Sequence, residues 1–186
     1  VSSNYDTHIF NYFNQQEGIP ALKVSETTAK ALRYGENPHQ AAHFYGNLEE
    51  LFEQLHGKEL SYNNLVDEDA AVNLIAEFPD QTAFAILKHT NACGCATAST
   101  VKEAYQKAFA ADTTSAFGGV LVTNKPVDLA AAEEMNSLFF EVLIAPAFSP
   151  EALVVLTTKK NRILLLQKMA VPGTKMIKTL LNGVIE

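Results

Sequence analysis

A lysine and a histidine stand side by side at the end of an apolar segment. Residues 82–87 form a continuous apolar run, which predicts a strand buried on both faces, and Lys88 and His89 follow it directly. Ligands of open α/β sheets bind beyond the carboxyl ends of strands. There His89 could relay a proton near neutral pH, and Lys88 could stabilise a developing negative charge or hold an anion. The alternative is a solvated lysine beside a histidine that is hydrogen-bonded at a strand end.

A polar stretch, residues 33–40, contains residue types that bind phosphate. Arg33 offers a planar guanidinium group, and Tyr34 offers a stacking face and a hydroxyl. An ordinary polar loop with a turn at Asn37-Pro38 accounts for the same residues. The residues alone leave both interpretations open.

Two further short motifs could approach a ligand. Asn63 and Asn64 precede a predicted helix, so they could cap the helix or hydrogen-bond a ligand amide. Residues 115–119, SAFGG, lie before a predicted strand, and their glycines would let the backbone come close to a ligand. The alternative for this motif is a tight turn with Phe117 in the core.

The cysteines raise the possibility of a metal site. His89, Cys93 and Cys95 are zinc-ligand types, but they supply three ligands and no clear fourth. Zinc deaminases pair His-x-Glu with Pro-Cys-x-x-Cys, and neither motif is present. We therefore expect core or turn cysteines and no metal.

Predicted helices and strands alternate from residue 67 onward. Helices are indicated by an apolar stripe or a capping signal, over 67–78, from Thr100, from Asp128 to about Phe139, and from Ser149. Strands are indicated by apolar runs, at 82–87, 119–123, 142–145 and 162–167. Before residue 67, short strands are expected at 23–24 and 43–45, and a short helix at 48–55. The alternation predicts an α/β layered fold with a largely parallel sheet.

Composition sets the class of protein. The chain has 186 residues, a net charge of −7 and an ordinary globular share of hydrophobic residues, 47%. An acidic chain has no broad attraction for nucleic acid or anionic membranes. No apolar run reaches the ~18 residues that a membrane span needs. Two cysteines are too few for a disulfide framework, so a cytoplasmic protein is expected.

Both ends of the sequence suggest a piece of a longer chain. Tyr5, Ile9, Tyr12 and Phe13 form an apolar stripe at helical spacing, and Gly18 and Pro20 would end that helix. Residues 180–185 predict a turn leading into a new strand. We expect residues 1–20 to be a helical lead-in from a preceding domain, and residues 21–186 to be a subdomain cut at its carboxyl end.

Several motifs, in order, resemble one family. LRYGENPHQAAHFY, LSYNNLVDEDAA, ILKHTNACG, TSAFGG and EVLIAPAFSPEAL are similar to segments of the formyltransferase region of bifunctional purine-biosynthesis enzymes. That region formylates aminoimidazole carboxamide ribonucleotide (AICAR). The resemblance extends from NYDTHIFNYF near the start to KTLLNGVIE at the end. It therefore covers nearly the whole chain.

The resemblance implies a fold and a reaction. The fold would be a three-layer α/β/α subdomain of the cytidine-deaminase-like type, with a mostly parallel mixed sheet and without that family's zinc. The reaction would transfer a formyl group from 10-formyltetrahydrofolate to the 5-amino group of AICAR, in the synthesis of IMP. The other activity of the bifunctional enzyme, IMP cyclohydrolase, would belong to the preceding domain.

The resemblance also implies roles for individual residues. The catalytic pair falls on Lys88 and His89: His89 would take the proton of the attacking amine, and Lys88 would hold the reacting groups and stabilise charge. Substrate-binding positions fall on Arg33, Tyr34, Asn64, Phe117, Gly118 and Glu141.

The chain departs from the family pattern at two motifs. The sequence has Asn91-Ala92-Cys93-Gly94 where the family usually has Asn-Pro-Cys-Gly, and Glu141 where some members have Asp. The expected partners are AICAR, folate and a second copy of the full-length protein, because the family's site is assembled from two subdomains and across a dimer. The alternatives are a non-catalytic dimerisation subdomain and a deaminase-like zinc hydrolase.

Overall fold

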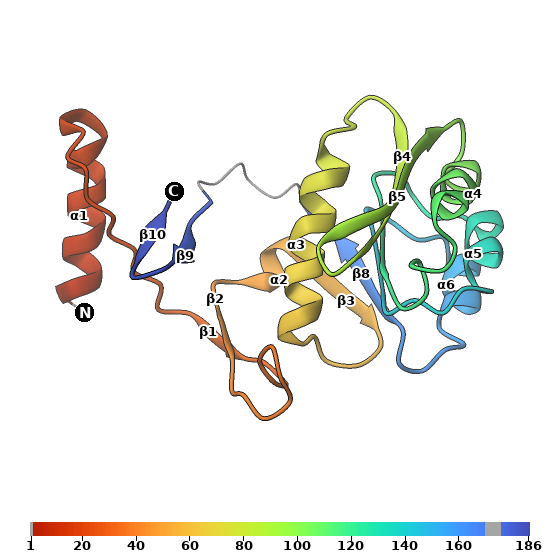
Figure 1. Cartoon of the computed structure of the whole chain (residues 1–186), viewed down its shortest axis with the longest axis horizontal. Coiled ribbons are helices and arrows are strands. Elements are labelled where there is room, and N and C mark those ends of the chain that lie inside the picture. Colours follow the sequence, from red (N-terminus) through yellow and green to blue (C-terminus); the bar gives the residue numbers. More distant parts are fainter. Residues whose placement is uncertain (1, 170–175) are drawn as a thin grey trace.

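The computed structural model describes residues 2–169 and 176–186, and a six-stranded sheet lies at its centre (Figure 1). The strands lie in the order β3-β8-β7-β6-β4-β5. Their bounds are β3 Phe52–His56, β4 Thr82–Lys88, β5 Asn91–Ala98, β6 Val120–Thr123, β7 Val142–Ala145 and β8 Ile163–Gln167. The central strands β4, β6 and β7 are almost wholly buried, as their apolar runs predict.

Helices cover both faces of this sheet. The face that carries Ala83 and Ala85 of β4 packs against α3 (Tyr62–Ala76) through Ala71, Val72 and Ile75. The opposite face, which carries Phe84 and Ile86, packs against three helices, α4 (Val101–Ala111), α5 (Leu129–Met135) and α6 (Pro150–Leu156). The predicted three-layer α/β/α fold with a mixed sheet is therefore confirmed.

The expectation that the sheet is mostly parallel is wrong. Strands β6, β7 and β8 are parallel to one another, but β3, β4 and β5 each pair antiparallel with their neighbours. The alternation of helix and strand that predicts a parallel sheet is broken after β4. There the chain turns straight back as β5 instead of crossing over through a helix.

The β4–β5 hairpin is the largest element that the sequence did not predict. Its turn has two residues, His89 and Thr90, with φ values of 54° and 64°. Two-residue hairpin turns with positive φ at both central positions are usually Asn-Gly or Asp-Gly, so His-Thr gives no sequence signal. No strand was therefore predicted over residues 91–98.

Two helix boundaries near the middle of the chain also differ from expectation. Helix α3 begins at Tyr62 rather than near residue 67, because Ser61 forms a capping box with Asn64. The segment 48–55 was expected to be one helix, but α2 ends at Leu51 and β3 follows at once. Pairing of β3 with β8 overrides the weak helical preference of this segment.

Helix α5 ends at Met135, several residues before the expected end near Phe139. Asn136 is its C-cap residue, and Leu138 and Phe140 turn into the core. The guanidinium of Arg162 donates to the side-chain oxygen of Asn136 at 2.9 Å and to the Leu138 carbonyl at 3.5 Å. These contacts hold the non-helical segment that follows Met135.

Three small elements lie away from the six-stranded sheet (Figure 1). Strands β1 (Ala29–Ala31) and β2 (His43–Tyr45) form a two-stranded ribbon, so the strand expected at 43–45 is confirmed and the one at 23–24 is wrong. Helix α1 (Ser2–Glu17) ends before Gly18, as expected, and buries none of its residues. Strands β9 (Lys178–Leu180) and β10 (Gly183–Ile185) form an exposed hairpin, which confirms the expected turn. Among the described residues, no helix is long and apolar enough to cross a membrane.

Candidate functional site

One cavity of about 580 Å³ brings together six of the eight predicted site residues. These are Tyr34, Asn64, Lys88, His89, Gly118 and Glu141. They come from five separate parts of the sequence, so only the folded sheet can place them around one space. The other two predicted residues, Arg33 and Phe117, border this group without lining the cavity.

The lysine of the predicted catalytic pair is held by a backbone carbonyl. The ammonium of Lys88, at the end of β4, donates to the Phe117 oxygen at 2.8 Å. An ammonium group has three protons, so this bond fixes its direction and leaves two protons for a ligand. The loop that precedes β6 therefore orients the Lys88 ammonium group.

The histidine of the pair stands at the tip of the β4–β5 turn. His89 is exposed, and no side-chain hydrogen bond to its imidazole is present within the described part of the chain. The turn itself is tied down, because the Thr90 amide donates to Asp67 Oδ1 on α3 at 2.7 Å. A positive φ is costly for a β-branched residue such as Thr90, and strain of this kind concentrates at functional sites.

Strand direction explains why these residues meet. The carboxyl end of β4, which carries Lys88 and His89, lies at the amino ends of β6 and β7, because β4 runs antiparallel to β6. Gly118 and Glu141 stand just before β6 and β7. The expectation that the site lies at carboxyl ends therefore holds for β4 and not for the parallel strands.

Glu141 is hydrogen-bonded to two other polar side chains at the wall of the cavity. Its Oε2 accepts hydrogen bonds from Lys58 Nζ at 3.1 Å and from Asn64 Nδ2 at 3.3 Å. The other end of the Asn64 amide accepts from the Ser61 amide and hydroxyl at 3.1 and 2.9 Å. Both ends of Asn64 are therefore engaged within the protein, and Asn64 orients the Glu141 carboxylate as well as capping α3.

The 33–40 loop closes one side of the cavity. The Tyr34 carbonyl accepts from the Tyr62 amide at 3.4 Å, and the Glu36 carbonyl accepts from Asn63 Nδ2 at 3.2 Å. These bonds dock the loop on the start of α3. Arg33 is exposed, and its guanidinium lies 5.4 Å from the Tyr34 ring centre. The turn of the alternative interpretation is present as well, because the Gln40 amide donates to the Asn37 carbonyl at 2.9 Å.

Phe117 is not a core residue, which corrects the alternative based on a buried turn. It is 59% exposed, and its ring centre lies 5.0 Å from that of Phe139, which is 54% exposed. The Gly118 amide donates to the Phe139 carbonyl at 2.8 Å. Phe117 lies on the loop that holds Lys88 and Phe139 lies between α5 and β7, so the apolar rim is formed by two separate segments.

Sequence reasoning missed three polar residues of the site. Lys58 pairs with Glu141, Asp67 fixes the hairpin turn, and Ser61 holds Asn64. The capping box at Ser61 and Asn64 had a sequence signal, namely a serine followed three residues later by a residue that can bond back. Lys58 and Asp67 act across long sequence separations and carried no local signal.

The two cysteines lie on β5, where Cys93 is half-buried and Cys95 is exposed. Burial raises the pKa of both thiols. Across residues 2–169 and 176–186, no group of three or more His, Cys, Asp or Glu side chains is arranged to hold a metal ion.

Comparison with known proteins places these features in a family. Bifunctional purine biosynthesis protein PurH of Bacteroides thetaiotaomicron is 58% identical over 185 residues, which is 100% of this chain and 36% of that protein. The proteins of the same name from Chloroflexus aurantiacus and Bacillus subtilis are 47% and 45% identical, over 92% and 97% of this chain. The chain spans about a third of the length of these relatives, namely 34% to 37%. The family described as AICARFT/IMPCHase bienzyme matches residues 1–186, and the chain belongs to that family.

Proposed function

We propose that this chain supplies the acid–base pair and the nucleotide-binding face of an AICAR formyltransferase site. The observation that carries the proposal is the single cavity that unites Lys88 and His89 with Tyr34, Asn64 and Glu141. A proton-transfer group, a fixed cation and a polar wall around one space are what formyl transfer to an amine requires. The formyl donor in this proposal is 10-formyltetrahydrofolate.

The chemistry assigns a task to each residue. The 5-amine of AICAR is a weak nucleophile because the ring and the carboxamide withdraw its lone pair, so orientation and a base are needed. His89 accepts the amine proton as the nitrogen bonds to the formyl carbon. Lys88 donates to the formyl oxygen as negative charge develops there. The bond from the formyl carbon to the donor nitrogen then breaks, and the proton held by His89 is available to that leaving nitrogen.

The wall of the cavity suits a ribonucleotide. Glu141 Oε1 has no bond to Lys58 or Asn64, whose contacts are to Oε2, so it can accept from a sugar hydroxyl. Tyr34 offers a ring and a hydroxyl, and Arg33 beside it offers a guanidinium for the phosphate. Because the chain spans about a third of its relatives, we propose that the folate pocket is completed by other parts of the full-length protein and by a second copy.

Substitution of the pair in the full-length protein tests this proposal. His89→Ala and Lys88→Ala are each expected to lower kcat for formyl transfer at least about 100-fold, the lower range for a lost acid–base group. Calorimetry should show AICAR affinity within a few-fold of wild type, because neither substitution removes Tyr34 or Glu141. His8→Ala on the exposed helix α1 is the matched control and should leave kcat unchanged.

The cyclohydrolase reaction of the same variants provides the second arm of this test. Ring closure of the formylated nucleotide to IMP should proceed at the wild-type rate in both. If His89→Ala retained formyl transfer and lost ring closure, this cavity would belong to the cyclohydrolase and our assignment would be wrong.

A second candidate function is assembly with a second copy of the protein. The apolar stripe of α1 is open to solvent, with Tyr5, Tyr12 and Phe13 each at least 60% exposed. Solvated aromatic stripes of this kind are typical of interfaces. Loss of a dimer on removal of α1 would support this role.

A further inference from the structure

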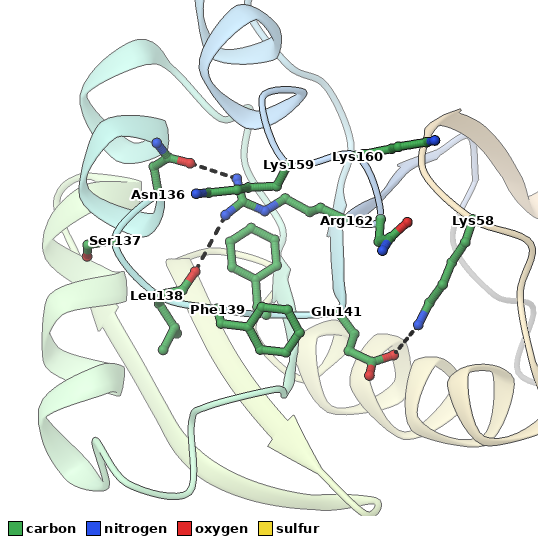
Figure 2. Close-up of a pocket in the computed structure, with 11 residues that line it drawn as sticks. Lys58, Asn136, Ser137, Leu138, Phe139, Glu141, Lys159, Lys160 and Arg162 are labelled. Carbon is green, nitrogen blue, oxygen red and sulfur yellow. Dashed lines mark hydrogen bonds and ion pairs between the residues drawn. The ribbon is translucent and has the colours of Figure 1, made fainter.

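A second cavity, of about 430 Å³, shares Glu141 with the first and has a different chemical character. Figure 2 shows four cationic side chains around it, Lys58, Lys159, Lys160 and Arg162. Glu141 is the one carboxylate among its lining residues. The chain as a whole carries a net charge of −7, so this concentration of positive charge runs against the overall composition.

The charge balance of the pocket leaves three cations without a carboxylate partner among the described residues. Lys58 pairs with Glu141 at 3.1 Å, which neutralises both. Within the described ranges, no carboxylate lies at ion-pair distance from Lys159, Lys160 or Arg162. Because field lines concentrate in a concave, partly apolar space, three uncompensated cations attract anions there more strongly than they would on a flat surface.

Arg162 is the buried member of this group. The residue is 4% exposed, and its guanidinium lies 4.1 Å from the Phe140 ring centre. It donates to Asn136, to the Leu156 carbonyl at 3.2 Å and to the Leu138 carbonyl, whereas its Nε is buried and finds no partner among the described atoms. Burial lowers the pKa of Arg162 to about 10, which still leaves it charged at neutral pH. A buried cation without an anion is costly, so a bound anion would offset that cost.

The main chain fixes the two ends of the pocket. Gly57, with φ of 100°, lies against the Arg162 carbonyl so closely that a Cβ would clash, and this contact places Lys58 beside the pocket. The Lys159 carbonyl is bonded to His56 Nε2 at 3.2 Å, which ties the 159–162 turn to β3. These two contacts therefore hold the main chain that carries Lys58, Lys159 and Arg162 in a fixed position.

We propose that this pocket, lined by Lys159, Lys160 and Arg162, binds an oxyanion group, a carboxylate or a phosphate, of a small-molecule ligand. The guanidinium protons of Arg162 are largely engaged by carbonyl oxygens, so Arg162 supplies fixed charge and the lysine ammonium groups make the direct contacts. Figure 2 shows Lys159 beside the guanidinium and Lys160 pointing away from it, so Lys160 must turn inward to contact the same anion. The site is separate from Lys88 and His89, and its occupancy does not depend on the formyltransferase assignment.

Titration of the chain with simple oxyanions tests the proposal. Inorganic phosphate and glutarate, each added at constant ionic strength, should shift the amide NMR signals of residues 136–141 and 159–162 along a saturable curve. Saturation by phosphate alone would identify a phosphate site, and saturation by glutarate alone a carboxylate site. If neither anion saturates, the proposal is overturned.

Charge-matched variants separate a site from general attraction. Lys159→Gln with Lys160→Gln should weaken the affinity at least about tenfold, since each removes one direct contact. Lys125→Gln with Lys178→Gln removes the same charge, but Lys125 lies beyond the carboxyl end of β6 and Lys178 lies on β9. If both pairs of substitutions weakened the anion affinity equally, the attraction would be diffuse electrostatics and the proposed site would be wrong. The melting temperature of the first pair should stay at the wild-type value, because neither lysine is buried.

Discussion

The carboxylate of Glu68 lies on the buried face of α3, four residues before Val72. The residue is 2% exposed, and neither oxygen has a hydrogen-bond partner among the described atoms. Burial, with a smaller contribution from the charge of Asp67, raises the pKa of Glu68 to about 8. Glu68 is therefore protonated in the folded protein at neutral pH. In the unfolded chain, where the pKa of its carboxyl is 4.5, it is ionised.

This difference makes stability depend on pH in a defined direction. Between pH 4.5 and 8, unfolding releases the Glu68 proton, so the free energy of unfolding should fall as pH rises, by about 1.4 kcal/mol per unit. The Glu68→Gln variant has no titratable carboxyl at this position, so it should lose this slope. Its free energy of unfolding at pH 7 should exceed that of the wild type by roughly 3 kcal/mol. Urea unfolding at several pH values from 5 to 8 measures it.

The control for this prediction is Glu53→Gln, which alters an exposed carboxylate on β3 and should keep the wild-type slope. A Glu68→Gln variant that retained the full slope would show that another group controls the pH dependence.

At the scale of elements, the packing of α4 on β5 depends on one glycine. A Cβ at Gly94 would overlap the carbonyl oxygen of Ala108, so the helix can approach the strand only if residue 94 has no side chain. Gly94→Ala must push α4 away or distort the hairpin.

We expect Gly94→Ala to lower the free energy of unfolding by about 1–3 kcal/mol, the usual range for overpacking. Gly183→Ala is the matched control, because a Cβ there meets nothing within 4 Å. Thermal unfolding of both variants makes the comparison. A Gly94→Ala protein as stable as wild type would mean that α4 moves at no cost.

The hairpin also marks the limit of what the sequence could predict about elements. Residues 82–87 and 142–145 are continuous apolar runs, so their strands were predictable from composition alone. The sequence has no Asn-Gly at 89–90 that would predict a hairpin. Helices are predicted in a regular order by the capping residues Thr100, Asp128 and Ser149, so nothing in the pattern indicated the reversal between β4 and β5. The turn is held from outside by a hydrogen bond to Asp67, and long-range contacts of this kind leave no local pattern.

The candidate site follows the same division. Lys88 and His89 were predictable because they end an apolar run, and residue types and short motifs indicated Arg33, Tyr34, Asn64, Phe117 and Gly118. The resemblance gave these positions their roles and added Glu141. The role of Lys58 was not predictable, since its contact with Glu141 spans 83 positions of sequence. Local patterns therefore identified candidates, and only the folded sheet showed which of them share a cavity.

At the scale of the whole molecule, the layered body and α1 are independent in their contacts. Helix α1 buries none of its residues, and its cross-contacts, Asn11 with the Lys23 carbonyl and Phe10 with the Lys23 ammonium, stay within the first 25 residues. The stability of the sheet and its helices should therefore not depend on this segment.

Removal of residues 1–25 tests that independence. The shortened chain is expected to keep the wild-type melting temperature within about 2 °C, because it loses no buried apolar surface. Sedimentation of both chains at equal concentration then shows whether α1 mediates association. A large fall in melting temperature for a monomeric wild-type chain would contradict the prediction, since it would reveal contacts that hold α1 to the body.

The pairing of β3 with β8 has a consequence for synthesis. Phe52 lies opposite Gln167 in the antiparallel register, so an early strand has no partner until one of the last strands of the sheet is made. At the usual ~5–20 residues per second, a separation of roughly 110 residues means a wait of about 5–20 seconds. During that wait the β4–β5 hairpin can close alone, while β3 stays an unpaired ribosome-bound segment. The pocket lined by Lys159, Lys160 and Arg162 also includes Lys58 from the other side of this gap, so it is among the last parts of the six-stranded layer to assemble.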